Sequence, residues 1–126
     1  MMTLILFVLT VFNAANGLAM VFAPRFWYAT VPGASETGPF NPHFIPDIGI
    51  AFLAAALGTA LAIRSTGTAR LAVLAPAALF LGGHAVLHIV ELSHHGEAVL
   101  RDTAMIVVPG LLPVALLGFC WKGATQ

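Results

Sequence analysis

Four long apolar stretches occupy most of this chain and constrain its fold more than any other feature of the sequence. A helix needs about 20 mostly apolar residues to cross the hydrocarbon core of a bilayer, so each stretch is long enough for one span. Charged residues make up only 8% of the 126 residues, too few to cover the water-facing surface of a soluble domain. The sequence therefore predicts an all-α fold, an integral membrane four-helix bundle forming a single transmembrane domain. The predicted helices cover about residues 3–22, 42–63, 69–94 and 98–121 of the domain 1–126.

Prolines mark several of the predicted helix boundaries. Pro24 is expected to stop the first helix, because proline cannot continue the hydrogen-bonding pattern of a preceding turn. Asn41 followed by Pro42 is a start signal for the second helix, with Asn as N-cap and Pro at the first helical position. Pro109 and Pro113 lie inside the fourth stretch and are expected to kink that helix without ending it.

The first apolar stretch is interpreted as a membrane helix and not as a signal peptide. A signal peptide carries basic residues before a short apolar segment, whereas no Lys or Arg precedes Arg25 here. The aromatic and basic residues 25–28 suit the membrane–water interface. The following stretch 29–40 is rich in glycine and proline and is predicted to be a loop.

The number of spans places both termini on one side of the membrane. That side also holds the turn after the second helix, and its basic residues are Arg64, Arg70 and Lys122. The other side holds Arg25 and Arg101. Cytoplasmic loops carry an excess of Lys and Arg, so this bias favours cytoplasmic termini. The predicted location is a bacterial inner membrane, with the second side facing away from the cytoplasm.

Acidic and histidine side chains are distributed unevenly between the two sides. All five acids and all five histidines fall on the second, extracytoplasmic side of the predicted topology. A chain this apolar does not need so many ionisable groups at one end for solubility, so the asymmetry is the main functional signal. The residues are Glu36, Asp47, Glu91, Glu97 and Asp102, together with His43, His84, His88, His94 and His95.

One face of the third predicted helix carries a row of these groups. At about 100° per residue, His84, His88, Glu91 and His95 fall within a narrow sector of the helix surface. With a rise of about 1.5 Å per residue, His84 would lie roughly 15 Å from the helix end, close to the middle of the membrane. An ionisable group at that depth is costly if it faces lipid, so this face is expected to point into the bundle.

A transition-metal site in the outer half of the bundle is the leading hypothesis. Neutral imidazole and carboxylate suit zinc, iron, copper or manganese, and the sequence does not choose among them. If the site is catalytic, the metal would activate water or oxygen against a lipid-soluble substrate; no residue is assigned a catalytic role. The predicted ligands of one or two ions are His84, His88 and Glu91 as the core, Asp47 and Asp102 completing the shell, and His95 and His43 as further candidates.

Haem is disfavoured as a cofactor. A membrane haem usually takes two axial histidines on opposite faces of its ring, whereas His84 and His88 share one face of one helix. His43 is the only histidine predicted on another helix, and it lies too shallow to oppose His84. No cofactor other than the metal is predicted.

Two other functions remain open at this stage. The chain could be a metal-free membrane subunit or scaffold, whose buried polar groups fix packing or dock a partner. A proton path is less favoured, because few polar groups lie below Asn13 and His84. The formal net charge is zero and no basic patch exists, which argues against nucleic acid. The expected partners are the lipid bilayer and either a homo-oligomer or a larger membrane complex.

Two short patterns carry a resemblance to other proteins. The first combines Asn41-Pro42-His43-Phe44 with Asp47-Ile48-Gly49, and the second is His84-Ala85 followed by His88 and Glu91. Together they resemble small bacterial four-helix integral membrane proteins of uncharacterised activity. The resemblance covers the second and third predicted helices and implies no activity, cofactor or site residue.

Overall fold

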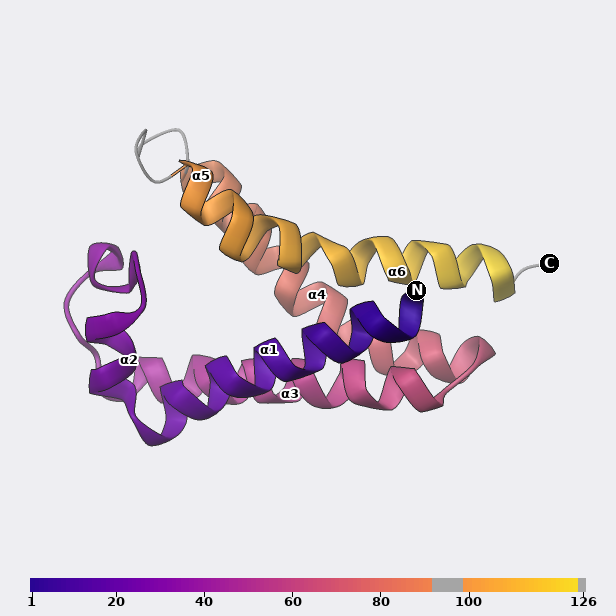
Figure 1. The fold of residues 1–126 in the computed structure, drawn as a ribbon, viewed down its shortest axis with the longest axis horizontal. Helices are drawn as coiled ribbons and strands as arrows, with labels where there is room; N and C mark the ends of the chain where they lie inside the picture. The colour runs from indigo at the N-terminus through magenta and orange to yellow at the C-terminus, as the bar shows by residue number, and fades with distance from the viewer. Residues whose placement is uncertain (92–98, 125–126) are drawn as a thin grey trace.

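The chain is all-α in the computed structural model, which describes residues 1–91 and 99–124, and no strand occurs in that part (Figure 1). Four of its helices are long and apolar enough to cross a membrane. The all-α prediction and the prediction of four potential spans are therefore confirmed. The elements are α1 (Met2–Phe22), α2 (Pro24–Thr30), the 3₁₀ turn η1 (Ala34–Thr37), α3 (Phe44–Arg64), α4 (Gly67–Glu91), α5 (Val99–Asp102), the π-helical turn η3 (Thr103–Val107) and α6 (Val108–Ala124).

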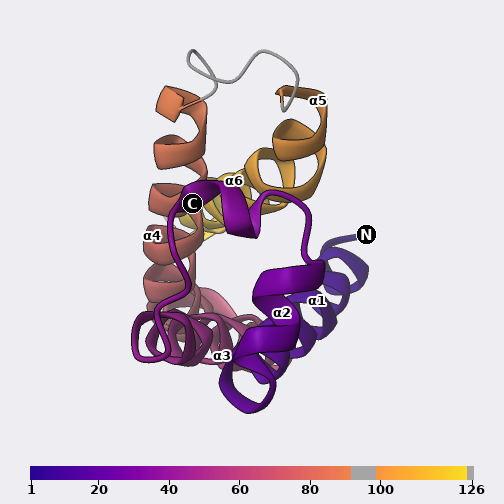
Figure 2. The same ribbon diagram turned by 90° about the vertical axis from the view of Figure 1, so that its left-hand side faces the viewer.

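The long helices pack as two pairs joined in series. α1 packs along α3, α3 packs on α4, and α4 packs on α6, whereas α1 and α6 touch only marginally. The start of α1, the turn between α3 and α4, and the last turn of α6 lie at one end of the molecule, here named the terminal end (Figure 1). The connection containing α2 and η1 lies with α5 at the opposite end, here named the loop end (Figures 1 and 2).

Glycines bring the paired helices close together. A Cβ atom on Gly17 of α1 would lie 2.7 Å from the carbonyl oxygen of Gly49 in α3. A Cβ atom on Gly110 of α6 would lie 2.7 Å from the carbonyl oxygen of Leu81 in α4. Both obstructions are backbone atoms, so a side chain at either position would push the helices apart. Close approach through small residues is how membrane helices gain packing contacts, because lipid is as apolar as their side chains.

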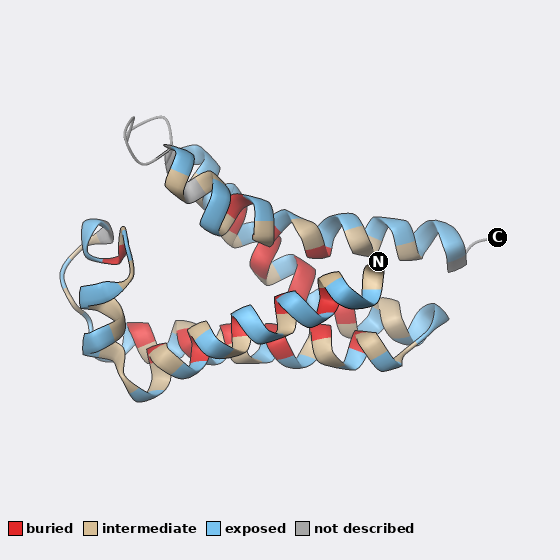
Figure 3. Ribbon diagram, viewed as in Figure 1, coloured by how far each residue is buried: buried red, intermediate tan, exposed pale blue. Residues whose placement is uncertain are grey.

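Buried side chains follow the faces on which the helices meet (Figure 3). Near the terminal end, Leu6, Ala62 and Leu74 bring α1, α3 and α4 together. A second cluster contains Met20 of α1, Phe52 of α3 and neighbouring residues of α4. Large apolar side chains on the other helix faces are exposed, as expected for surfaces in contact with lipid.

The connections after α1 and before α6 differ from the sequence prediction. Residues 24–30 form the short helix α2. Pro24 therefore follows the end of α1 and also occupies the first position of the next helix. The predicted fourth helix is interrupted by the π-helical turn η3 immediately before Val108 and Pro109. Pro109 lacks an N–H group and its ring clashes with the carbonyl four residues earlier, which accounts for the wider turn at this place.

Candidate functional site

His84 and His88 lie one turn apart on α4, with their rings in contact. The ring centroids are 4.8 Å apart and the ring planes meet at 72°. His84 also meets the ring of Phe52 in α3 edge-on at 5.7 Å and stacks on Phe80 at 6.2 Å. The Nδ1 atom of His88 is buried. The two imidazoles share one face of α4, and their described ring contacts are with aromatic rings and with each other.

Asp47 and His43 form a pair of their own, one turn apart at the start of α3. Nε2 of His43 lies 3.3 Å from a carboxylate oxygen of Asp47, and their side chains are 91% and 54% exposed. Asn41 supports this helix start, because its side-chain oxygen accepts hydrogen bonds from the backbone N–H groups of His43 and Phe44 at 3.0 and 2.9 Å. The pair therefore sits at the exposed loop end of α3.

The predicted transition-metal site is wrong. Among the residues that the structure describes, no group of three or more His, Cys, Asp or Glu side chains could hold a metal ion. His84 packs against Phe52 of α3 and against His88 of its own helix, while His43 and Asp47 pair at the surface. Of the other predicted ligands, Glu91 ends α4 and Asp102 ends α5, with side chains outside the described set, and His95 lies outside the described residues altogether.

Polar side chains inside the protein hold α1 to α3. The hydroxyl groups of Thr10 and Thr59 lie 2.9 Å apart across this helix pair, and Thr59 is fully buried. Asn13, which is only 2% exposed, donates its amide to the carbonyl of Leu9 at 2.7 Å. Hydrogen bonds inside a membrane protein satisfy polar groups that lipid cannot, so these residues contribute to packing and to the local helix geometry.

Asn16 connects α1 to the interfacial helix α2. Its side-chain oxygen accepts a hydrogen bond of 2.7 Å from the indole Nε1 of Trp27, and its amide lies 3.8 Å from the sulfur of Met20. The sequence analysis placed residues 25–28, which include Trp27, at the membrane interface and named no partner for the indole. The available signal was the indole N–H, because a half-buried tryptophan usually finds a hydrogen-bond acceptor.

The loop between α2 and α3 is joined to α5 by a two-pronged ion pair. Both terminal nitrogens of Arg101 lie 3.1 Å from the two carboxylate oxygens of Glu36 in η1. Gly33 lies beside the same guanidinium, since a Cβ atom there would come within 2.8 Å of it. The sequence analysis placed Glu36 in the predicted loop 29–40 and named no partner for it. The contact joins residues 65 positions apart, and no local pattern predicts such a pair.

Replacing Glu36 with glutamine is expected to loosen this loop while changing the free energy of unfolding by only about 0.2–1 kcal/mol. The carboxylate is 55% exposed, so water screens much of the attraction. The measurement is the mobility of a nitroxide spin label at Ser35, in a variant whose single cysteine Cys120 is replaced by serine. Asp47→Asn removes another exposed carboxylate, one that pairs with His43 outside this contact, and is the matched control. An unchanged label mobility in Glu36→Gln would show that the ion pair does not hold the loop.

No protein-family model matches this chain, and the searches of curated proteins and of solved structures find no match either.

Proposed function

We propose that this chain is a membrane-embedded structural subunit that assembles with a second copy of itself along α6. The observation that carries the proposal is the low burial of α6. In the span Thr103–Gly123, 17% of the most apolar window is buried, compared with 28% to 33% in the other three spans. The large exposed side chains of α6, together with Gly118, are named the α6 flank: Val108, Leu111, Val114, Phe119 and Trp121.

The composition of the α6 flank suits contact with another helix as well as with lipid. Gly118 is exposed, and a Cβ atom there would meet nothing within 4 Å. Trp121, which lies one turn further along the same side of α6, is 62% exposed. A small residue beside a large one lets two copies of a helix approach and interdigitate across a two-fold axis. This arrangement supports self-association through α6.

The interior polar groups support a structural role for the same reason. The hydroxyl pair of Thr10 and Thr59 joins α1 to α3, and the bond between Asn16 and Trp27 joins α1 to α2. Each such bond contributes about 0.6 kcal/mol on average in a membrane protein, so their main effect is to fix which helix faces meet. His84 of α4 adds an aromatic contact with Phe52 of α3.

Within this proposal, the terminal end faces the cytoplasm of a bacterial cell and the protein lies in the inner membrane. The support is the distribution of basic residues: Arg64, Arg70 and Lys122 belong to the terminal end, and Arg25 and Arg101 to the loop end. The positive-inside tendency favours the end with more of them as cytoplasmic.

The proposal is tested by measuring energy transfer between donor- and acceptor-labelled copies reconstituted in lipid vesicles at decreasing protein-to-lipid ratios. We expect transfer that persists on dilution and that falls when Gly118 is replaced by leucine. Gly83→Leu is the matched control, because Gly83 is also exposed, with open space around it, but belongs to α4. Transfer that disappears on dilution of the unmodified protein, or that Gly118→Leu leaves unchanged, would refute assembly through α6.

A further inference from the structure

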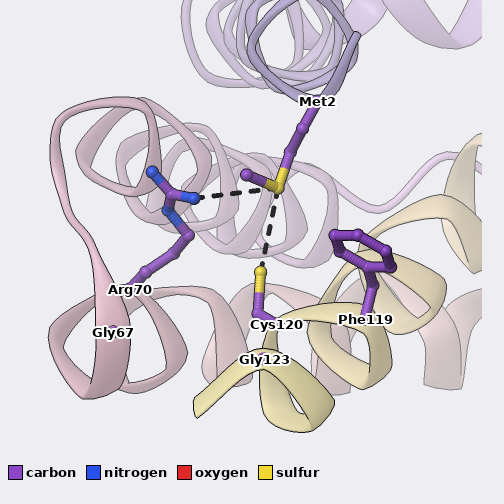
Figure 4. A pocket seen from close by; sticks show the side chains of 6 residues that line it. All are labelled: Met2, Gly67, Arg70, Phe119, Cys120 and Gly123. Carbon is purple, nitrogen blue, oxygen red and sulfur yellow. Dashed lines mark hydrogen bonds between the residues drawn. The ribbon is translucent and has the colours of Figure 1, made fainter. Parts of the chain in front are cut away.

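A small cavity opens at the terminal end, where α1, α4 and α6 come together (Figure 4). Its volume is about 210 Å³. This is less than the roughly 300–1,000 Å³ of pockets that enclose drug-sized ligands, so the cavity suits one polar group of a larger molecule. The residues that line it are Met2, Gly67, Arg70, Phe119, Cys120 and Gly123.

Arg70 is the only charged side chain among these lining residues. Its Nε donates a hydrogen bond of 3.0 Å to the carbonyl of Ala62 in the last turns of α3, and one terminal nitrogen lies 3.8 Å from the sulfur of Met2. These contacts orient the guanidinium group at the cavity wall (Figure 4). An arginine side chain has five N–H donors, so most of them are left for a ligand.

The charge around the cavity favours an anion. Arg64 ends α3 and Lys122 lies in the last turns of α6, both at the terminal end. Of the acidic residues whose backbone the structure describes, none lies at this end. Glu36 belongs to η1 and Asp47 to the start of α3, whereas Glu91 ends α4 and Asp102 ends α5. A negatively charged group in the cavity would therefore meet basic side chains without a competing carboxylate.

The other walls of the cavity are apolar and reach the lipid-facing surface. Phe119 lines the cavity and is 71% exposed, and Met2 contributes its thioether. Gly67 and Gly123 stand at the first turn of α4 and near the last residue of α6, so the cavity lies at the level where these helices leave the apolar layer. A ligand held there can keep a charged group at Arg70 while its chains extend from the cavity into the bilayer.

We propose that this cavity binds the phosphate group of an anionic phospholipid, with Arg70 as its main ligand. A planar guanidinium matches the oxygens of a phosphate group in a two-pronged contact. Basic pockets between membrane helices are a known mode of recognition for anionic headgroups. The cavity holds the headgroup phosphate and leaves the acyl chains outside it.

The test measures lipid retained by the detergent-purified protein in native mass spectrometry, together with its melting temperature. The probes are dioleoylphosphatidylglycerol, dioleoylphosphatidylcholine and inorganic phosphate. We expect preferential retention of phosphatidylglycerol and stabilisation by it. Arg70→Gln should weaken its retention about fivefold, the effect of one basic side chain near an anionic membrane surface. Arg64→Gln is the matched control, because Arg64 is exposed at the same end but does not line the cavity.

A second variant keeps the test decisive if Arg70→Gln fails to fold through loss of its bond to Ala62. Cys120→Leu fills the cavity without changing any charge and is expected to reduce phosphatidylglycerol retention to a similar extent. Equal retention of both lipids by the unmodified protein, or full retention of phosphatidylglycerol in folded variants, would overturn the proposal. Stabilisation by inorganic phosphate as large as that by phosphatidylglycerol would identify free phosphate as the ligand and overturn the lipid assignment.

Discussion

Replacing Gly110 with leucine is expected to separate α6 from α4 and to lower the free energy of unfolding by about 3 kcal/mol, the upper part of the usual range for overpacking. The added side chain would start 2.7 Å from the carbonyl oxygen of Leu81 and 2.8 Å from the Cβ atom of Ala85. Neither atom can move aside without moving α4. The measurement is a titration of the protein in detergent micelles with increasing fractions of dodecyl sulfate, in which circular dichroism monitors unfolding.

Gly83→Leu provides the control for this experiment. Gly83 lies in α4, and a Cβ atom there would meet nothing within 4 Å, so leucine can extend into lipid. The control should unfold within about 0.5 kcal/mol of the unmodified protein, as for a substitution away from packed contacts. Equal destabilisation by the two variants would mean that helix propensity, and not the contact between α4 and α6, determines the effect.

Replacing Phe52 with alanine is expected to weaken the contact between α3 and α4 by about 3 kcal/mol. Its side chain is 8% exposed, and its ring meets Phe80 edge-on at 5.1 Å and His84 at 5.7 Å. The value is the lower end of the range for removing a buried aromatic ring. Helices in a membrane are stabilised by their packing contacts, whereas burying apolar surface adds little because lipid is also apolar. The same dodecyl sulfate titration measures the loss.

A second readout separates this local packing effect from general destabilisation. Loss of the Phe52 ring should change the chemical shifts of the His84 imidazole, because an aromatic ring in edge contact would be removed. Phe44→Ala is the matched control: the residue belongs to the same helix, but its side chain is 58% exposed. Unchanged His84 resonances in Phe52→Ala would show that the two rings do not pack in the membrane-embedded protein.

The lengths of the apolar stretches were sufficient to predict the long helices, because crossing a bilayer imposes a minimum length. The second predicted helix, 42–63, begins at Phe44 and ends at Arg64 in the structure. The wide turn Thr103–Val107 was not predicted beyond a kink, since the sequence does not show whether a proline distorts a helix by bending or by widening it. Local hydrophobicity therefore predicts where the spans lie better than it predicts their internal geometry.

The metal-site prediction was wrong because it combined reliable positions within one helix with uncertain positions between helices. The position of His84 and His88 on one face of α4 follows from their spacing of four residues, and their rings lie in contact there. Whether Asp47 reaches them depends on how α3 crosses α4, which periodicity does not specify. Asp47 instead pairs with His43, its neighbour one turn away. Small residues and aromatic rings at the helix contacts determine the crossing, and they carry no signal that identifies their partners in advance.

The ion pair between Glu36 and Arg101 joins two parts of the chain that leave the ribosome at different times. They are separated by 65 positions. At about 5–20 residues per second, Arg101 is synthesised roughly 3–13 s after Glu36. α3 is complete once Arg64 has been synthesised, so in the later part of this interval α1 and α3 can associate as a hairpin through Gly17 and Gly49. The order of translation thus favours early assembly of the first helix pair, with α4 and α6 added later and the loop joined to α5 only after α5 has been synthesised.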